Sequence, residues 1–177
     1  MEEASVKKQH AWLSECLDWI SVMIGALILS IVIFTLLFRI VTVDGDSMME
    51  TLHHNDRVIL VTEFYSLDRG DIVVVARQDG TSVIKRVIAI AGDTLDIDED
   101  GKVYLNGEEL QEDYIRDGVT PAFDFKGPYT VKDGEIFAMG DNRKWSYDCR
   151  DTGPFLVDDV VGEAVFRLFP LDVIGEI

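Results

Sequence analysis

Hydrophobic and polar residues follow one pattern near the start of the chain and another pattern afterwards. From Trp19 to Phe38 the sequence reads WISVMIGALILSIVIFTLLF, twenty residues without a charge. A helix of this length is about 30 Å long, the thickness of the hydrocarbon core of a bilayer. The apolar region of a cleaved secretory signal is shorter, about 7–15 residues, and ends in a small-x-small site that Phe38-Arg39-Ile40-Val41 does not offer. The pattern therefore predicts a retained transmembrane helix at residues 19–38.

After Arg39, short apolar runs separated by turn residues replace the unbroken apolar segment. Runs rich in valine and isoleucine are typical of β-strands. The expected strands are residues 58–61, 71–76, 82–90, 95–97, 102–105, 135–139 and 160–169. Gln78-Asp79-Gly80 and Asp98-Glu99-Asp100-Gly101 are typical of hairpin turns. The fold class that follows is mainly β, with a single N-terminal transmembrane helix.

These patterns predict three parts: an N-terminal segment at 1–18, the helix at 19–38 and a β-rich domain at 39–177. The stretch Glu108 to Lys126 is polar and irregular, so a smaller inserted lobe is expected at about residues 93–135. Lys7 and Lys8 precede the helix while Arg39 and Arg57 follow it, so the count of positive charges does not decide its orientation.

Charge and cysteine content narrow the possible partners. The chain has 33 acidic and 16 basic residues and a formal net charge of -17. Such a surface repels phosphate backbones, so no nucleic-acid partner is expected. Cys16 and Cys149 lie on opposite sides of the expected transmembrane helix. A disulfide between them is therefore excluded, and both are expected to be free thiols.

Lys85 is unusual for its place in the sequence. In the expected strand at 82–90, side chains alternate between the two faces of the sheet. The neighbours of Lys85 on one face are Val83, Val87 and Ala89, and those of Arg86 on the other face are Ile84, Ile88 and Ile90. At least one cation therefore stands among apolar side chains. Two interpretations stay open: an edge strand whose lysine extends to water, or a buried amine whose lowered pKa suits a general base.

Two polar segments are further candidates for a site. Asp44-Gly45-Asp46-Ser47-Met48-Met49-Glu50-Thr51-Leu52 follows the apolar run, and a serine after Gly-Asp is by itself more typical of a turn than of a nucleophile. Gly140-Asp141-Asn142-Arg143-Lys144-Trp145-Ser146-Tyr147-Asp148-Cys149-Arg150 is by itself typical of a solvated loop with ion pairs. His53-His54 is interpreted as part of a turn, because further ligands are not evident. No metal or other cofactor is expected.

Taken together and in order, these segments resemble bacterial type I signal peptidases. The likeness covers the apolar helix, the Ser47 segment, Gly70-Asp71-Ile72-Val73-Val74, Lys85-Arg86-Val87-Ile88, the loop at 140–150 and Val165-Phe166-Arg167-Leu168-Phe169-Pro170. The lysine resembles the bacterial form of the family, since the endoplasmic-reticulum form has a histidine in that position. The resemblance implies a signal-peptidase-like β fold and a serine endopeptidase that removes signal peptides.

The resemblance also implies a role for each matching residue. Ser47 is the expected nucleophile, Lys85 its general base, and Met48 lies next to the substrate. Ser146 is expected to hold the lysine amine by a hydrogen bond. The backbone N–H of Ser47 is expected to form part of the oxyanion hole, and Gly45 occupies a position whose side chain assists in some relatives. The other expected supporting residues are Asp141, Arg143, Asp148, Arg150 and Arg86, with Arg86 paired to Asp141.

Three positions depart from the usual pattern of the family. Glu50 and Ala91 stand where proline is usual, and Cys149 stands where serine is usual. Glu50 loses a fixed φ angle and brings an anion near the dyad, which would favour the protonated form of Lys85. The departures are expected to slow the enzyme or alter its substrates without removing the dyad.

The resemblance implies a single-pass cell-membrane protein whose residues 1–18 lie in the cytoplasm and whose catalytic domain lies on the extracytoplasmic side. Its partners would be membrane lipid and secretory preproteins with small residues near the cleavage site. One alternative is a catalytically impaired membrane-anchored paralogue that acts as a binding module. Another, a self-cleaving Ser/Lys repressor-type protease, shares the β fold, but such proteins carry a DNA-binding domain and lack a spanning helix.

Overall fold

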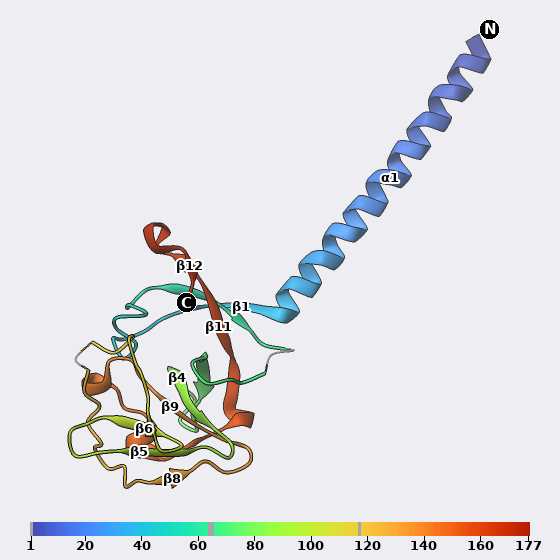
Figure 1. Cartoon of the computed structure of the whole chain (residues 1–177). Coiled ribbons are helices and arrows are strands. Elements are labelled where there is room, and N and C mark those ends of the chain that lie inside the picture. Colours follow the sequence, from blue (N-terminus) through green and yellow to red (C-terminus); the bar gives the residue numbers. More distant parts are fainter. Residues whose placement is uncertain (1, 64–65, 117) are drawn as a thin grey trace. The chain divides into compact units, whose positions relative to one another are not determined.

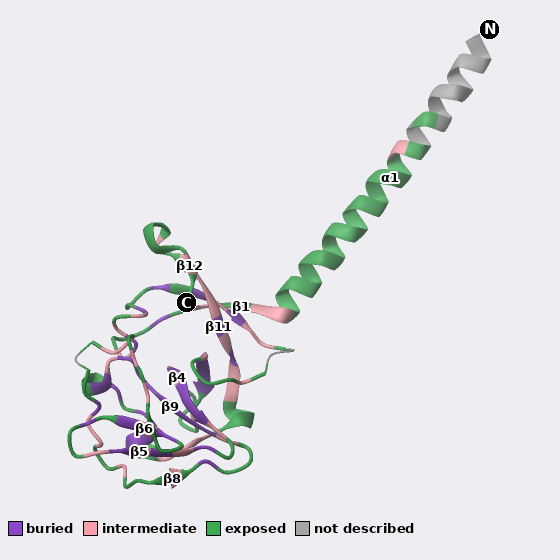
Figure 2. Cartoon of the chain, viewed as in Figure 1, coloured by how far each residue is buried: buried purple, intermediate pink, exposed green. Residues whose placement is uncertain are grey.

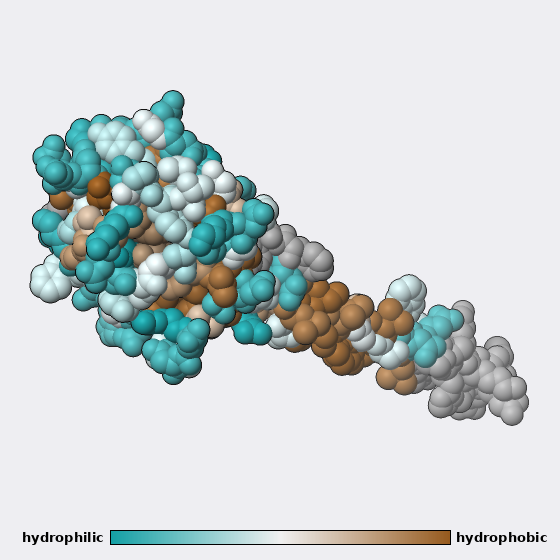
Figure 3. Space-filling view, turned by 90° about the horizontal axis from the view of Figure 1, so that it is seen from below, coloured by the Kyte–Doolittle hydropathy of each residue, from teal (hydrophilic) through white to brown (hydrophobic). Residues whose placement is uncertain are grey.

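The computed structural model describes residues 2–63, 66–116 and 118–177, in two compact units, residues 1–38 and 39–177. In the first unit, helix α1 (Glu2–Leu37) contains the stretch Glu15–Leu37, which is long and apolar enough to cross a membrane. The apolar side chains of residues 17–36 are exposed (Figures 2 and 3). The helix ends one residue earlier than predicted, because Phe38 begins strand β1 (Phe38–Thr42). The sequence pattern did not predict β1, because this short strand begins at the last residue of the apolar run.

The main sheet of the second unit has eight strands, with the order β1-β2-β11-β3-β4-β9-β10 and with β12 paired to β11 (Figure 1). From β2 to β10, and between β11 and β12, the neighbouring strands of this sheet are antiparallel. Its remaining strands are β2 (Arg57–Val61), β3 (Ile72–Ala76), β4 (Ser82–Ile90), β9 (Glu135–Met139), β10 (Phe155–Leu156), β11 (Val160–Phe169) and β12 (Gly175–Glu176). The prediction of a mainly β protein with one N-terminal apolar helix is confirmed.

A second sheet has four strands in the order β7-β6-β5-β8. These are β5 (Thr94–Ile97), β6 (Val103–Leu105), β7 (Glu108–Glu109) and β8 (Tyr129–Thr130). Both predicted hairpins are present, since β3 pairs with β4 and β5 pairs with β6 in antiparallel register. The two-residue strands β7 and β8 are too short to produce an alternating pattern that could be recognised in the sequence.

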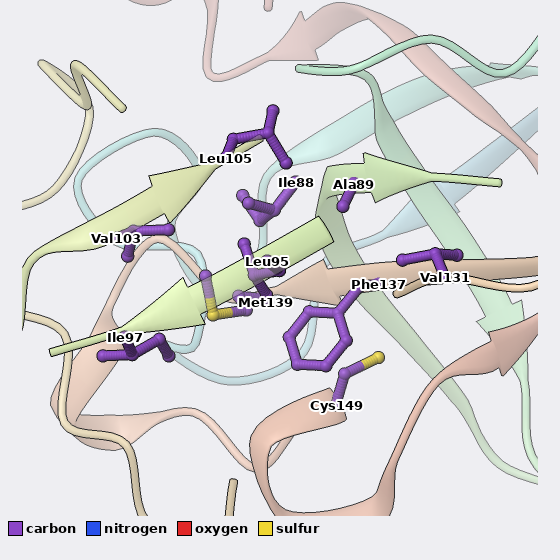
Figure 4. Packing of buried hydrophobic residues seen from close by; sticks show 10 residues of the cluster. All are labelled: Ile88, Ala89, Leu95, Ile97, Val103, Leu105, Val131, Phe137, Met139 and Cys149. Atoms are coloured by element: carbon purple, nitrogen blue, oxygen red, sulfur yellow. The ribbon is translucent and has the colours of Figure 1, made fainter. Parts of the chain in front are cut away.

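The two sheets share one hydrophobic core (Figure 4). Side chains from β4 and β9 of the main sheet pack against those from β5 and β6 of the smaller sheet. The cluster consists of Ile88, Ala89, Leu95, Ile97, Val103, Leu105, Val131, Phe137, Met139 and Cys149. Because burial of this apolar surface stabilises β4 and β9 together, it fixes the strand that carries Lys85 and the strand that leads into the loop at 140–150.

A second core lies under the segment that contains Ser47. Met48 and Leu52 are both fully buried there, against residues of β2 and β3 such as Leu60 and Val74. These two side chains anchor the turn that carries Ser47. The expectation that the Met48 side chain lies next to the substrate is therefore corrected, because the side chain packs into the core.

Four short helices complete the fold in the described part of the chain: η1 (Arg143–Trp145), α2 (Cys149–Thr152), η2 (Val157–Asp159) and η3 (Leu171–Val173). The first two lie within the polar loop at 140–150 and just after it. Asp148 caps α2: its side chain accepts the backbone N–H of Arg150, and Asp151 accepts the N–H of Asp148. This reciprocal capping gives the loop a defined conformation.

Candidate active site

Lys85 and Ser47 lie in contact although 38 positions separate them in the sequence. Lys85 Nζ is 2.8 Å from Ser47 Oγ and donates a second hydrogen bond to the carbonyl of Ile84 at 2.9 Å. Strand β4 pairs with β3 on one side and β9 on the other, so Lys85 does not lie on an edge strand. The side chain is 2% exposed. Of the two interpretations left open by the sequence, the structure therefore supports the buried amine.

Burial decides the protonation of this amine. Desolvation lowers the pKa of Lys85 to about 8, while the negative charge of Asp148 acts in the opposite direction. The positive charges of Arg150 and Arg77 lower it further. A lysine in water has a pKa near 10.4, so the buried amine is uncharged in a substantial fraction of molecules near neutral pH. An uncharged amine beside a hydroxyl can accept the hydroxyl proton.

The backbone around Ser47 is held by Asn142. The backbone N–H of Asn142 donates to the carbonyl of Ser47 at 3.0 Å, and its Nδ2 donates to the carbonyl of Asp46 at 2.9 Å. Asn142 was not among the residues predicted from the sequence to support the site. Its neighbour Asp141 drew attention as a charged residue, whereas an uncharged amide within a polar loop gave no separate signal.

Arg86 and Asp141 form a pair directly beside this contact. Arg86 Nε donates to Asp141 Oδ1 at 2.9 Å, and its second terminal nitrogen donates to Oδ2 at 2.7 Å. The Thr51 hydroxyl donates to the same carboxylate. Asp141 is thus buried with its oxygens bonded, and it connects β4, the Ser47 segment and the loop at 140–150. Thr51, like Asn142, was not predicted to support the site.

A second buried pair joins Arg143 to Glu112. The Arg143 guanidinium binds both carboxylate oxygens of Glu112 and the Thr120 hydroxyl, and its Nε donates to the carbonyl of Gly140 at 3.1 Å. Burial opposes a charge on Arg143, but the Glu112 carboxylate outweighs it and raises the pKa of the guanidinium. Glu112 and Thr120 lie in the stretch at 108–126, which the sequence pattern presented only as polar and irregular.

Asp148 and Arg150 form a third buried pair. Arg150 donates from Nε and from a terminal nitrogen to the two Asp148 oxygens at 2.9 and 2.8 Å, and Gly140 donates its N–H to Asp148 at 3.0 Å. Burial would raise the pKa of Asp148, but the bonds from Arg150 hold it below its ordinary value. The loop at 140–150 is therefore a buried network of charges, and its interpretation as a solvated loop is wrong.

Ser146 is buried within this network at 5% exposure. Within the part of the chain that the structure describes, its hydroxyl makes no well-formed hydrogen bond, but it lies near Asp148 and helps to lower the pKa of that carboxylate. The hydrogen bond expected between Ser146 and Lys85 is thus not formed here, where the carbonyl of Ile84 receives that amine proton instead. The expected role of Ser146 toward the Lys85 amine therefore stays a prediction.

Gly45 lies on the exposed side of Ser47, with a φ angle of +90° that favours glycine. Its backbone N–H donates to His54 Nδ1 at 3.1 Å, and the same nitrogen lies 3.3 Å from an Asp44 carboxylate oxygen. His54 thus closes the turn before Ser47, the kind of role inferred from the sequence. Among the described residues, no cluster of three or more His, Cys, Asp or Glu side chains could hold a metal ion.

The two departures near the site do not contact the dyad. Glu50 is exposed and lies 3.5 Å from Arg116 Nε, and it is not among the groups that shift the pKa of Lys85. Solvent screens the charge of this exposed side chain, so its effect on the protonation of Lys85 stays a prediction. Cys149 is buried in the core, where its sulfur accepts the Ala138 N–H and burial raises the pKa of the thiol to about 12. A thiol with that pKa is not a nucleophile near neutral pH.

A cavity of about 250 Å³ opens beside the dyad. Both Ser47 and Lys85 line it, together with backbone and side chains of the segments at 41–44 and 82–84. Leu60, Val74 and Val161 make its floor apolar. The cavity thus joins the Ser47 hydroxyl and the Lys85 amine to an apolar surface.

Comparisons with known proteins identify the family of the chain. The signal peptidase family, peptidase S26, matches residues 16–169. The chain is 35% identical to signal peptidase I S of Bacillus subtilis over 97% of both chains. It is 36% identical to signal peptidase I of Bacillus amyloliquefaciens over 96% of this chain and 97% of the relative. A crystal structure of a signal peptidase I from Enterococcus faecalis has 28% identity and a TM-score of 0.47 over 57% of this chain and 98% of that one.

The chain is a serine endopeptidase of the hydrolase class. It belongs to the signal peptidase family, peptidase S26, as the resemblance of its motifs implied.

Proposed function

We propose that this chain is a membrane-anchored signal peptidase that removes signal peptides from secretory preproteins through a Ser47/Lys85 dyad. The observation that carries the proposal is the buried Lys85 amine, with a pKa of about 8, at 2.8 Å from the Ser47 hydroxyl. Family membership supports the reaction class. Glu50 and Cys149, which motivated the alternative of an impaired binding module, lie in solvent and in the core respectively.

In the proposed reaction, the uncharged Lys85 amine takes the Ser47 proton as Oγ attacks the carbonyl carbon of the scissile bond. The tetrahedral intermediate collapses when the ammonium of Lys85 returns a proton to the leaving amine, and the mature chain departs. A water molecule then loses a proton to Lys85 and attacks the acyl-enzyme, which releases the signal peptide and restores Ser47. One group thus serves as base and acid in both halves of the reaction.

The negative charge on the intermediate requires donors fixed in place. In this proposal the backbone N–H of Ser47 supplies one. Asn142 and Asp141 hold the turn from which that N–H projects, through the Ser47 carbonyl and Thr51. Gly45 brings no side-chain donor, so a backbone group or water supplies any second bond.

The preprotein would bind in an extended conformation in the cavity beside the dyad. The segments at 41–44 and 82–84 line that cavity, and β4 pairs with β9 only from Arg86 onward, so the edge of β4 at 82–84 that faces away from β3 can pair with an added peptide strand. The volume of about 250 Å³ is limited, which favours small side chains near the cleaved bond. The apolar part of α1 would anchor the chain in the bilayer, with the β domain on the extracytoplasmic side.

The test is cleavage of a preprotein by the full-length chain in detergent. We expect the wild type to release the mature chain. In Ser47→Ala and Lys85→Ala, kcat should fall at least about a thousandfold. Lys132→Ala, which removes an exposed lysine of the smaller sheet, is the matched control and keeps full activity. Equal cleavage by all four proteins would refute the dyad, whereas binding without cleavage by the wild type would support the binding module.

A further inference from the structure

The tyrosine at position 114 lies between the two arginines of the site. Its ring centroid is 4.2 Å from Cζ of Arg86 and 5.8 Å from Cζ of Arg143. Arg86 is bound to Asp141 and Arg143 to Glu112, each through two hydrogen bonds. The ring therefore contacts the cation of both buried pairs, and the stretch at 108–126 supplies it.

The hydroxyl of Tyr114 adds a third connection. It donates to Glu112 Oε1 at 2.8 Å, so Tyr114 contacts both members of the Arg143–Glu112 pair. Burial and the neighbouring Glu112 carboxylate raise the pKa of this phenol, so the group remains a donor at any pH near neutral. Tyr114 thus links the pair at Asp141 to the pair at Glu112.

The Tyr114 ring attracts the guanidinium groups of Arg86 and Arg143 electrostatically. Two guanidinium groups near each other repel, and the negative face of an aromatic ring attracts each cation. A ring shared by Arg86 and Arg143 therefore reduces their repulsion and restricts both side chains. An aliphatic residue of similar volume would fill the space but would lack this attraction.

Both arginines end at the turn that holds the nucleophile. Arg86 fixes the Asp141 carboxylate, and Arg143 Nε fixes the carbonyl of Gly140. The next residue, Asn142, holds the carbonyls of Ser47 and Asp46. A shift of either guanidinium would therefore be transmitted to Ser47 through one short turn.

We propose that Tyr114 is a positioning residue of the active site, whose ring holds Arg86 and Arg143 and thereby keeps Ser47 in place for Lys85. The inference rests on the proposed function for its effect on turnover. Its geometric part, that Tyr114 fixes the bond between Asn142 and Ser47, can be measured without turnover. Arg116 of the same stretch also reaches Glu50, but that exposed ion pair contributes little.

The test compares Tyr114→Leu and Tyr114→Phe with a matched control, Tyr129→Leu. Tyr129 makes the same kinds of contact outside the site: its hydroxyl donates to Glu135, and Lys132 Nζ lies 5.9 Å from its ring centroid. Both leucine variants are expected to lower the melting temperature. Only Tyr114→Leu is expected to lower kcat for a preprotein, by about tenfold or more, because small displacements at a nucleophile are costly.

Two further features separate positioning from simple destabilisation. KM should change less than twofold in Tyr114→Leu, because the cavity residues are untouched, and Tyr114→Phe should restore most of kcat, because the ring is kept. In hydrogen exchange on the uncleaved wild type and variants, the Asn142 amide should exchange at least about tenfold faster in Tyr114→Leu and at the wild-type rate in Tyr129→Leu.

Wild-type protection of the Asn142 amide in Tyr114→Leu, or an equal loss of kcat in Tyr129→Leu, would overturn the inference. If the wild type cleaves no preprotein, the proposed function fails, and the exchange measurement still decides the role of Tyr114. If Tyr114→Leu does not fold, Tyr114→Met makes the same comparison with a flexible side chain of nearer volume.

Discussion

The carbonyl oxygen of Ser47 lies in the space that a β-carbon on Gly140 would fill. The same β-carbon would also overlap the hydroxyl of Ser146. Glycine at 140 therefore allows the loop at 140–150 to approach the nucleophile segment closely enough for Asn142 to bind Ser47. The φ angle of Gly140 does not require glycine; the close contact does.

Gly140→Ala is accordingly expected to lower kcat by about tenfold or more and to destabilise the domain by about 1–3 kcal/mol. The control is Gly127→Ala, between β7 and β8, whose β-carbon would overlap the side chains of Asp96 and Phe125 outside the cavity. The control should lose stability and keep kcat. Turnover and urea denaturation of both variants check this, and a Gly140→Ala enzyme with normal kcat would contradict the close contact.

The pH dependence of cleavage follows from the lowered pKa of Lys85. The reaction needs the uncharged amine, and the pKa is about 8. We expect kcat/KM to rise with pH and to level off above that value. At pH 6 only about one molecule in a hundred has the amine uncharged, so kcat/KM should be about a hundredfold below the plateau. A profile that is flat from pH 6 to 9 would contradict the assignment of Lys85 as the base.

The same shift makes a prediction for stability. In the unfolded chain Lys85 regains its ordinary pKa of 10.5, so between pH 8 and 10 the unfolded state binds more protons than the folded state. Stability should therefore rise with pH across that interval, and the penalty of burying the amine is fully present below pH 8. A shift of this size corresponds to about 3 kcal/mol.

Lys85→Met should remove this penalty. We expect the variant to be inactive, more stable than the wild type at pH 7, and less dependent on pH between 8 and 10. Chemical denaturation at pH 7 and pH 10 measures both effects. If Lys85→Met proves less stable at pH 7, the hydrogen bonds of the amine to Ser47 and Ile84 outweigh its desolvation.

Glu50 offers a test of the departure from the usual family pattern. Its side chain is exposed and faces Arg116, and no shift of the Lys85 pKa is attributed to it. Glu50→Gln should leave the pH profile of kcat/KM unchanged and alter stability by less than about 0.5 kcal/mol. A profile displaced toward lower pH in Glu50→Gln would show that this anion does act on the amine.

The sequence predicted most of the fold because its strands have strong local patterns. The runs at 82–90, 135–139 and 160–169 agree with β4, β9 and β11 to the residue. Strand β1 was missed because it is short and begins at Phe38, the last residue of the apolar segment assigned to the helix. The bounds of short elements such as β7 and β8 depend on partners distant in the sequence, and a local pattern carries no information about them.

Less of the candidate site than of the fold could be predicted from the sequence. Lys85 attracted attention because a cation among valines and isoleucines is anomalous, and the structure buries it. Asn142, Glu112 and Tyr114 gave no such signal, since their importance lies in contacts between segments about 30 to 95 residues apart. Met48 was expected next to the substrate because it follows Ser47 in the sequence. Its apolar side chain is instead buried in the core, where removal from water stabilises the fold.

Strand β1 ends the main sheet, and none of the described strands pairs with its outer side. An open strand edge accepts any extended chain of suitable sequence, including another copy of this protein that has partly unfolded. Its length of five residues, mostly exposed, limits how much of a foreign strand it can hold. Preparations of this protein at high concentration should therefore be most prone to self-association through β1, and a short peptide with small side chains should suppress that association by competing for the same edge.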